Sequence, residues 1–383
     1  MKQYLLIALA IVCFFPPACG GEDGNKESND IGSLTEDIVE EVAEVVTPPV
    51  KSWSEVSGVE IPGITKIMGF GCNEDWLYVN VDGIVSKGLF AWPVGTDEEI
   101  TQVFTGVGIL EVLNSGALVA SYPNNNTTAI VGLDAEGNAT DMGFTGEAME
   151  VKKISYSGSH LVTMTKDTTT ADYMLHRAKL PDGEFEQSGI RLKETGMSIY
   201  ATPDTVYLLT LYNEVVGTAC HRIPLTAGAE DPYEDCPFFP DYADNGGTGS
   251  EPYSVNAYIY GEGLRMGLWF RVSNKGEKSA SHYVATDKIK WTEVEGIPPI
   301  EPTAWHHDGD NIYIGLTGSG GKSAAWTAPY NAEEPATDIG EGLPGTTEKS
   351  GVAGICTAGN ILYLAWLDHN PGGSTIRIMK RAR

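Results

Sequence analysis

The sequence predicts an all-β fold, and three observations support that prediction. Short apolar segments rich in Val, Thr, Tyr and Trp alternate with turns, and the chain contains 45 glycines in 383 residues, which favours strands joined by tight turns. Similar segments recur along the chain at nearly regular intervals. Two distant segments, around Trp53 and Trp291, match each other closely. A period in the forties with about four strands per unit is typical of a β-propeller.

The N-terminus has the layout of a cleaved export signal. Lys2 precedes an apolar stretch from Tyr4 to Phe15, and Cys19 follows shortly after it. The stretch is too short to span a bilayer. Residues 1–18 are therefore predicted to be a signal peptide.

Ala18-Cys19-Gly20 resembles the end of a bacterial lipobox, in which a small residue precedes the cysteine that receives the lipid. The resemblance implies an envelope lipoprotein anchored through Cys19. Gly20, rather than Asp, after the cysteine implies the outer membrane. Pro16-Pro17 departs from the usual lipobox residues. Two alternatives are lipidation of Cys13 and simple secretion after cleavage behind Ala18.

Residues 19–50 are predicted to form an acidic, lipid-anchored tether. They are rich in Asp and Glu and contain no aromatic residue, so they cannot bury enough apolar surface to fold alone. Val39, Val42 and Val45 would share one face of a helix. The tether is therefore a disordered stalk or contains one short helix, and residues 51–383 are assigned to the propeller.

Seven repeating units can be counted from the start of the second strand of each unit. The shortest interval, from Trp76 to Ala117, is 41 residues, and the longest, from Val206 to Leu264, is 58. Seven units predict seven four-stranded blades. The second strands are predicted to start at Trp76, Ala117, Leu161, Val206, Leu264, Ile312 and Ile361.

The matching tryptophan segments predict how the ring closes. Trp291 falls in the expected outermost strand of the fifth blade, so Trp53 is expected to mark an outermost strand too. No blade precedes Trp53, whereas the seventh unit reaches Arg383 after only three strands. We therefore predict that residues 52–57 complete the last blade, which also removes exposed strand edges. The competing architecture is two stacked β-sandwiches.

Four cysteines lie beyond residue 50, an even number that suits an oxidising compartment. Cys72 and Cys356 fall at equivalent positions, just after the inner strands of the first and last blades. They are expected to form a disulfide across the closure or to remain two buried thiols. Cys220 and Cys236 flank the acidic turn of one hairpin, and a disulfide is predicted between them.

The longest insertion, Phe238–Tyr253, contains the candidate ligand loop. Its oxygen-bearing side chains suit Ca²⁺, a hard cation, although the spacing of a regular calcium-binding loop is missing. An ordinary polar loop is the alternative, and no catalytic residue or metal site is assigned from the sequence. The candidate ligand residues are Asp241, Asp244, Asn245 and Glu251.

Trp305-His306-His307-Asp308 contains the only pair of adjacent histidines. Neighbouring residues of a strand point to opposite faces, so the two rings cannot bind one ion in a regular strand. The segment is predicted to be the end of a strand that enters a turn.

Two fragments resemble sialidase-type propellers. The segment from Thr286 to Thr292 is similar to the Asp-box, a turn motif that opens an outer strand, but it lacks the glycine of that motif. Arg222-Ile223-Pro224 is similar to a segment whose arginine binds the substrate carboxylate in that family. The resemblance implies the same role for Arg222. The catalytic tyrosine and the other arginines of the family have no identifiable counterparts.

The net charge of −27 argues against a nucleic-acid partner, because phosphate binding requires a basic face. No cofactor is expected apart from the Ca²⁺ considered above. We expect a non-catalytic module, anchored to the membrane by lipid, that binds a protein or glycan through its loops. The candidate loops link an outer strand to the next inner strand or join the two middle strands of a blade. The alternative is a secreted carbohydrate-active or other hydrolytic enzyme with a carboxylate cluster at the channel mouth.

Overall fold

A computed structural model gives the fold of the compact unit Val50–Arg383. Among the described residues, no helix is long and apolar enough to cross a membrane. Cys19 and the tether lie outside the described residues. The structure describes residues 52–113, 116–124, 127–134, 138–147, 149–179, 186–192, 195–212, 217–226, 234–235, 255–259, 266–274, 277–286, 290–300, 302–317, 324–345, 347, 349–370 and 373–383.

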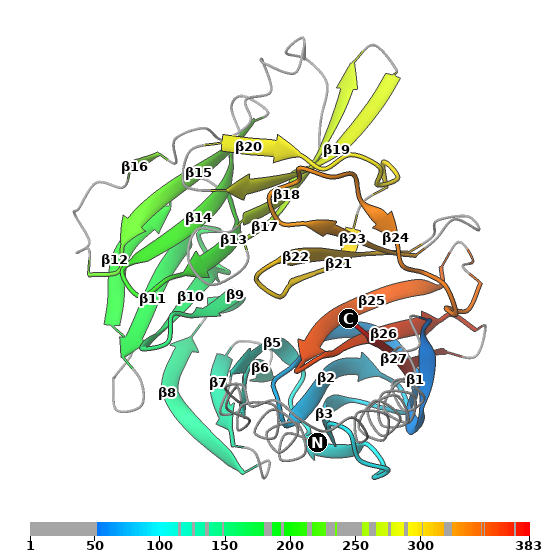
Figure 1. Ribbon diagram of the computed structural model, residues 1–383. Helices are drawn as coiled ribbons and strands as arrows, with labels where there is room; N and C mark the ends of the chain where they lie inside the picture. The colour runs from blue at the N-terminus through cyan, green and yellow to red at the C-terminus, as the bar shows by residue number, and fades with distance from the viewer. Residues whose placement is uncertain are drawn as a thin grey trace, which may run out of the picture. The chain divides into compact units, whose positions relative to one another are not determined.

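This part of the chain forms antiparallel sheets without an α-helix (Figure 1). Five of the sheets have four strands each. They are β5 (Gly108–Leu113) to β8 (Ala139–Glu147) through β6 (Gly116–Asn124) and β7 (Thr127–Leu133); β9 (Met149–Tyr156), β10 (His160–Asp167), β11 (Tyr173–Lys179) and β12 (Glu186–Leu192); β13 (Thr195–Ala201), β14 (Thr205–Tyr212), β15 (Gly217–Pro224) and β16 (Glu234–Asp235); β17 (Val255–Ile259), β18 (Met266–Asn274), β19 (Glu277–Thr286) and β20 (Lys290–Glu293); and β21 (Pro302–His307), β22 (Asn311–Leu316), β23 (Ala325–Pro329) and β24 (Thr337–Asp338).

A seven-stranded sheet contains both the first and the last strands of the unit. Its order is β25 (Gly351–Ala358), β26 (Ile361–Asp368), β27 (Ser374–Ala382), β1 (Ser54–Cys72), β2 (Trp76–Gly83), β3 (Gly88–Pro93) and β4 (Thr101–Phe104). The first half of β1 pairs with β27, and its second half pairs with β2. Ile64, at the changeover, is paired with both Ser374 and Gly83. The sheet therefore consists of two four-strand groups that share β1.

The predicted second strands are all present as β2, β6, β10, β14, β18, β22 and β26. The fifth is described from Met266 onward. Trp291 lies in β20, the outermost strand of its sheet. One expectation was wrong in detail: Cys72 and Cys356 lie within β1 and β25 rather than after them. Both strands continue further because their backbones keep pairing with β2 and β26.

The first strands of neighbouring sheets contact one another, as β1 does with β5, β5 with β9, β9 with β13, and β13 with β17. The same contact joins β21 to β25 and β25 to β1. In each of these pairs, a first strand packs against another first strand. Figure 1 shows the sheets following one another in chain order, with β1 beside β27.

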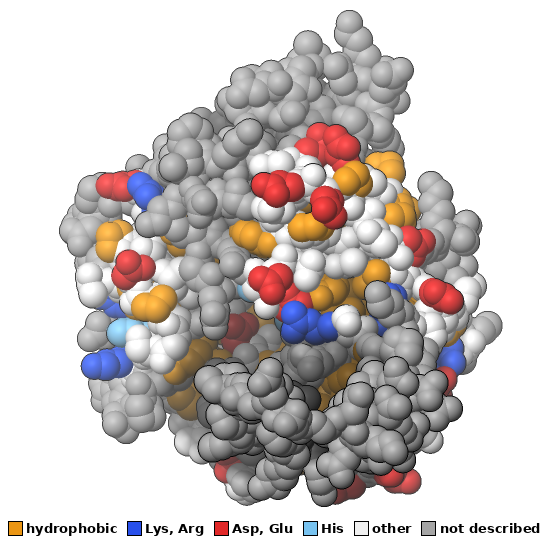
Figure 2. All heavy atoms as spheres, in the orientation of Figure 1, with side chains coloured by type: hydrophobic (Ala, Val, Ile, Leu, Met, Phe, Trp, Pro, Cys, Tyr) orange, Lys and Arg blue, Asp and Glu red, His pale blue; other side chains and the backbone are white. Residues whose placement is uncertain are grey.

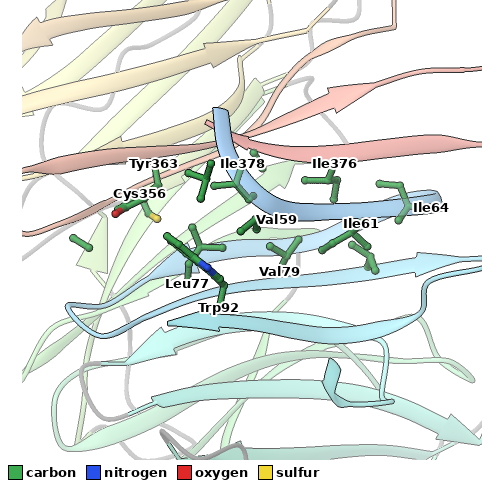
Figure 3. Close-up of a cluster of buried hydrophobic side chains, with 14 residues drawn as sticks. Val59, Ile61, Ile64, Leu77, Val79, Trp92, Cys356, Tyr363, Ile376 and Ile378 are labelled. Atoms are coloured by element: carbon green, nitrogen blue, oxygen red, sulfur yellow. The ribbon is translucent and has the colours of Figure 1, made fainter. Parts of the chain in front are cut away.

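The hydrophobic core is divided among clusters within and between these sheets. One cluster joins β1 and β2 to β25, β26 and β27, and Figure 3 shows its side chains pointing toward one another. Trp53 is buried in a second cluster with Ile339 and Trp366. Its indole Nε1 donates a 2.6 Å hydrogen bond to the Ile339 carbonyl. Burying a large apolar side chain contributes roughly 1.5–3 kcal/mol, so Trp53 fixes the start of β1.

The turn between the first and second strands repeats a local hydrogen-bonding pattern in several sheets. Its first residue has a side-chain oxygen that accepts a backbone N–H two or three residues later. Such local acceptors favour a turn over a continued strand. The residues that act in this way are Asn73, Ser157, Thr202 and Asp308.

Candidate binding turn and inner-strand contacts

The turn between β2 and β3 exposes two large apolar side chains. Ile84 is 94% exposed and Val85 is 74% exposed, and no other large hydrophobic side chain is exposed among the described residues. The turn is one of those that join two middle strands, the class of loop that the sequence predicted to carry binding. The two adjacent side chains form an exposed apolar surface, which makes the turn a candidate contact site.

Backbone hydrogen bonds hold this turn against β1. The amides of Ile84 and Val85 donate to the Gly63 carbonyl at 3.1 and 3.3 Å. Gly63 has φ +68°, and a Cβ there would lie 2.5 Å from the Cβ of Val85, so only glycine allows this approach. Lys87 pairs with Asp82 at 3.4 Å across the base of the turn. The exposed pair is thus presented by a fixed backbone.

One ladder position on the first strands recurs in every four-strand group. Tyrosine occupies the opposing residue of the second strand in two four-stranded sheets and in both four-strand groups of the seven-stranded sheet, at Tyr207, Tyr313, Tyr78 and Tyr363. The first-strand residues at this position are Gly71, Glu111, Ser155, Tyr200, Ala257, His306 and Cys356.

Several of these side chains bond to the next sheet. The backbone amide of Tyr156 donates to the Glu111 carboxyl. The Ala201 amide donates to the Ser155 hydroxyl at 3.0 Å. In both cases the donor is on the next first strand, at the residue that directly follows the equivalent ladder position.

His306 and Cys356 continue the same pattern. His306 Nε2 lies 2.7 Å from the Thr357 hydroxyl, and Cys356 forms a disulfide with Cys72, with the Cα atoms 5.8 Å apart. The structure thus contains the disulfide that was one of the two expected outcomes for these cysteines. It joins β25 to β1, where other sheets are joined by hydrogen bonds.

Asp308 is the centre of a group of interacting polar and ionisable side chains. Its side chain is 2% exposed, and its Oδ2 lies 2.6 Å from Arg383 Nη2. Tyr313 donates its hydroxyl proton to the same carboxylate, while the other oxygen accepts the amides of Asp310 and Asn311. Every strong acceptor of Asp308 is therefore in use.

Burial and these contacts set the protonation of the group. Burial, with His307 and Arg383 nearby, lowers the pKa of His306 to about 3, so its ring is neutral at pH 7. Burial opposes ionisation of Asp308, but hydrogen bonds from Tyr313, Asn311 and Asp310 and the charge of Arg383 lower its pKa overall. Burial raises the pKa of Tyr313, and Asp308 raises it further. The group is a neutral imidazole beside a satisfied ion pair.

Glu111 differs from these groups because it can change charge near neutrality. Burial raises the pKa of its carboxyl to about 7, against the weaker opposing effect of the Tyr156 amide. A carboxyl with a pKa in this range can donate or accept a proton at physiological pH. Among the described residues, Glu111 is the one with this property, and the sequence analysis did not identify it. The sequence feature that could have indicated it is a single Glu in an otherwise apolar strand.

Most residues proposed from the sequence as ligand or disulfide groups cannot be placed. The candidate ligand loop and Cys236 lie outside the described residues, as does the side chain of Cys220. Arg222, likened above to a sialidase arginine, forms a 2.7 Å ion pair with Glu234 on β16. His307 ends β21 as predicted, and Asp308 begins the turn. The ligand residues outside the described parts are Asp241, Asp244, Asn245 and Glu251.

Comparison with solved structures supports the architecture. A prolyl endopeptidase structure superposes with a TM-score of 0.52 at 10% identity, over 90% of this chain and 51% of that chain. The sheet order and the contacts between first strands are those of a propeller. The unit is a β-propeller domain. The chain spans about half the length of the prolyl endopeptidase, so the likeness extends to the fold of that part alone.

Two further structures are similar to this propeller at lower scores. The β-propeller domain of the Trilobed protease from Pyrococcus furiosus has a TM-score of 0.43 at 8% identity, over 81% of this chain and 79% of that chain. A luciferin-regenerating enzyme has a TM-score of 0.41 at 12% identity, over 88% and 95% of the two chains. No protein-family model and no curated protein sequence matches the chain.

Proposed function

We propose that the propeller has seven blades and that β1 closes the ring by serving as the outermost strand of the last blade and the innermost strand of the first. The pairing of β1 with both β27 and β2 supports this closure. So does the disulfide between Cys72 and Cys356, since it joins the same two groups of strands.

We further propose that this ring is a non-catalytic binding module for a protein or glycan. The observation that carries the proposal is the fixed β2–β3 turn, with Ile84 94% and Val85 74% exposed. Two apolar side chains on a rigid backbone suit the apolar patch of a partner protein or the face of a sugar ring. Binding there orders little additional chain and therefore costs little conformational entropy.

The binding test uses the double variant Ile84→Ser with Val85→Ser. A glycan array and quantitative enrichment from envelope extracts identify the ligand of the wild-type domain. The double variant should bind that ligand about tenfold more weakly, because the apolar contact is lost. Glu74→Ala, an exposed change in the β1–β2 turn of the same sheet, is the matched control. Unchanged affinity of the double variant would refute a binding role for the turn.

The proposed location is the bacterial outer membrane, with lipid on Cys19 and the acidic segment 19–50 as tether. The support is the lipobox-like sequence around Cys19. Mass spectrometry of the mature N-terminus should find a lipid-modified Cys19 in the wild type and none in Cys19→Ala. An unmodified wild-type N-terminus would exclude the anchor.

A hydrolytic enzyme is the second candidate, and Glu111 is the observation that favours it. Its carboxyl has a pKa of about 7, which suits a general acid or base. Chromogenic glycosides, esters and peptide amides test this function. Turnover by the wild type that disappears in Glu111→Gln, with a pH-profile limb near 7, would establish the enzyme and displace the binding module.

A further inference from the structure

Lys153 occupies an unusual position on the first strand of its sheet. Five first strands contain a β-bulge, in which one residue of the first strand has no partner on the second strand. Pairing with the second strand resumes at the residue after it. Four of the five residues at which pairing resumes are small, and only Lys153 is long. The five are Gly69, Lys153, Ser198, Ala304 and Gly354.

The geometry at two of the small residues explains the preference for them. A Cβ at Gly69 would lie 2.4 Å from the Cβ of Leu110 on the next sheet. A Cβ at Gly354 would lie 2.4 Å from Phe70. This ladder position therefore faces the next first strand at close range. Lys153 has the equivalent place on β9, which contacts β13.

Lys153 is also without a charged partner. Its neighbour Lys152 forms a 2.5 Å ion pair with Glu150, whereas the side chain of Lys153 makes no ion pair or hydrogen bond within the described part of the chain. The side chain is partly buried, and burial lowers the pKa of its ammonium group. A desolvated ammonium without a counter-charge costs free energy, and bulges like the one before Lys153 often re-aim side chains at functional sites.

We propose that Lys153 anchors a binding site for a carboxylate ligand at the junction of β9 and β13. A single ammonium matches the single charge of a carboxylate, whereas phosphate sites typically gather several donors. The ligand supplies the counter-charge that the folded chain lacks. This site is separate from the β2–β3 turn, so it holds or fails independently of what that turn binds.

The experiment titrates the whole propeller with acetate, the smallest probe of this class, at constant ionic strength set with sodium chloride. Lysine ¹³Cε resonances are followed by NMR, and the Lys153 signal is assigned by its absence in Lys153→Gln. Acetate should shift this signal with saturation and raise the apparent pKa of Lys153. Acetamide, the neutral isostere, should do neither.

The matched variants are Lys153→Gln and Lys152→Gln. Following acetate by saturation transfer, we expect the apparent Kd to rise about tenfold in Lys153→Gln, the loss of one charged hydrogen bond, and to stay unchanged in Lys152→Gln. Lys153→Arg, which keeps the charge, should retain binding and shows that loss does not come from misfolding. A Lys153 signal unmoved by acetate, a response matched by acetamide, or equal loss in both glutamine variants would overturn the proposal.

Discussion

Asp308 shows how one buried carboxylate connects residues from distant parts of the chain. It caps its own turn through the amides of Asp310 and Asn311 and binds Tyr313 on β22 and Arg383 beyond β27. Because Asp308 is nearly inaccessible to water, its charge depends on these partners. Losing one of them leaves a buried charge incompletely compensated.

Arg383→Ala is therefore expected to destabilise the domain by about 2 kcal/mol, the usual scale for a hydrogen bond to a charged group when the cation is partly exposed. Urea unfolding at pH 7 measures the change. Asp310→Ala, an exposed substitution in the same turn, should leave the free energy of unfolding nearly unchanged. Equal stability of Arg383→Ala and the wild type would show that Tyr313 and the turn amides suffice.

The local structure around Asp308 could be predicted from the sequence, but its partners could not. A strand entering a turn follows from Trp305-His306-His307-Asp308 itself. The Thr357 hydroxyl that contacts His306 lies 51 residues away, and the Arg383 partner of Asp308 is also distant in sequence. Such contacts depend on how neighbouring sheets pack, which the local pattern does not determine.

The third strands of three consecutive sheets share a buried histidine at one ladder position. His176 is opposite Thr163, His221 opposite Leu208, and His282 opposite Trp269. Apolar residues occupy this position in the two remaining four-stranded sheets and in both four-strand groups of the seven-stranded sheet, namely Val131, Trp326, Phe90 and Met379. The imidazoles thus replace core side chains.

Two of these histidines make the domain sensitive to acid. Burial lowers the pKa of His176 and of His282 to about 4. His176 faces the Thr165 hydroxyl and the Phe144 ring, and His282 faces the Pro298 carbonyl and the Trp305 ring. No charged side chain contributes to either pKa shift. The unfolded chain, with an ordinary histidine pKa near 6.5, binds protons first as the pH falls.

Stability should therefore be complete above about pH 6.5 and decline between that pH and about 4, by about 2 kcal/mol per histidine at pH 5. Urea unfolding at pH 7.5 and pH 5 measures the decline. His176→Gln should remove about half of the decline caused by the two residues. Gln at exposed His369 is the control variant. A pH dependence that survives substitution of both His176 and His282 would contradict this assignment.

The positions of strands were predictable at this scale because apolar segments and turn residues alternate clearly. Exact ends were less so: Cys72 and Cys356 were expected beyond their strands, yet both pair within them. The recurring bulge before Lys153 was also not predictable. An extra residue changes the pairing partner without changing the local composition.

At the scale of the whole domain, the Cys72–Cys356 disulfide joins residues 284 positions apart. A cross-link over so long a loop stabilises by about 5 kcal/mol in the chain-entropy estimate. The double variant Cys72→Ser with Cys356→Ser should therefore unfold at lower urea concentration than the oxidised wild type. Adding a reductant should lower the wild-type midpoint by more than that of the variant, which keeps only the predicted Cys220–Cys236 disulfide. Identical midpoints would mean that the reduced, unfolded chain already holds these segments together.

The pairing of β1 with β27 was anticipated because the Trp53 segment repeats the Trp291 segment. The exposure of Ile84 and Val85 was not anticipated, because two apolar residues next to a strand are normally expected to be buried in the core. Only the fixed approach of the turn to Gly63 places them in water. The periodicity of the sequence thus predicts the repeated strands. The exposure of side chains at a single turn depends on tertiary packing, which the periodicity does not predict.

The sharing of β1 also means that the domain could be cut elsewhere. Ser54 pairs with Lys380, so a linker of a few residues could join Arg383 to Ser52, and new ends could be opened in the turn between β9 and β10. Such a circular permutant would convert a seam held by hydrogen bonds and one disulfide into continuous backbone. The strands on either side of the new chain ends would then be the ones held together only by noncovalent contacts.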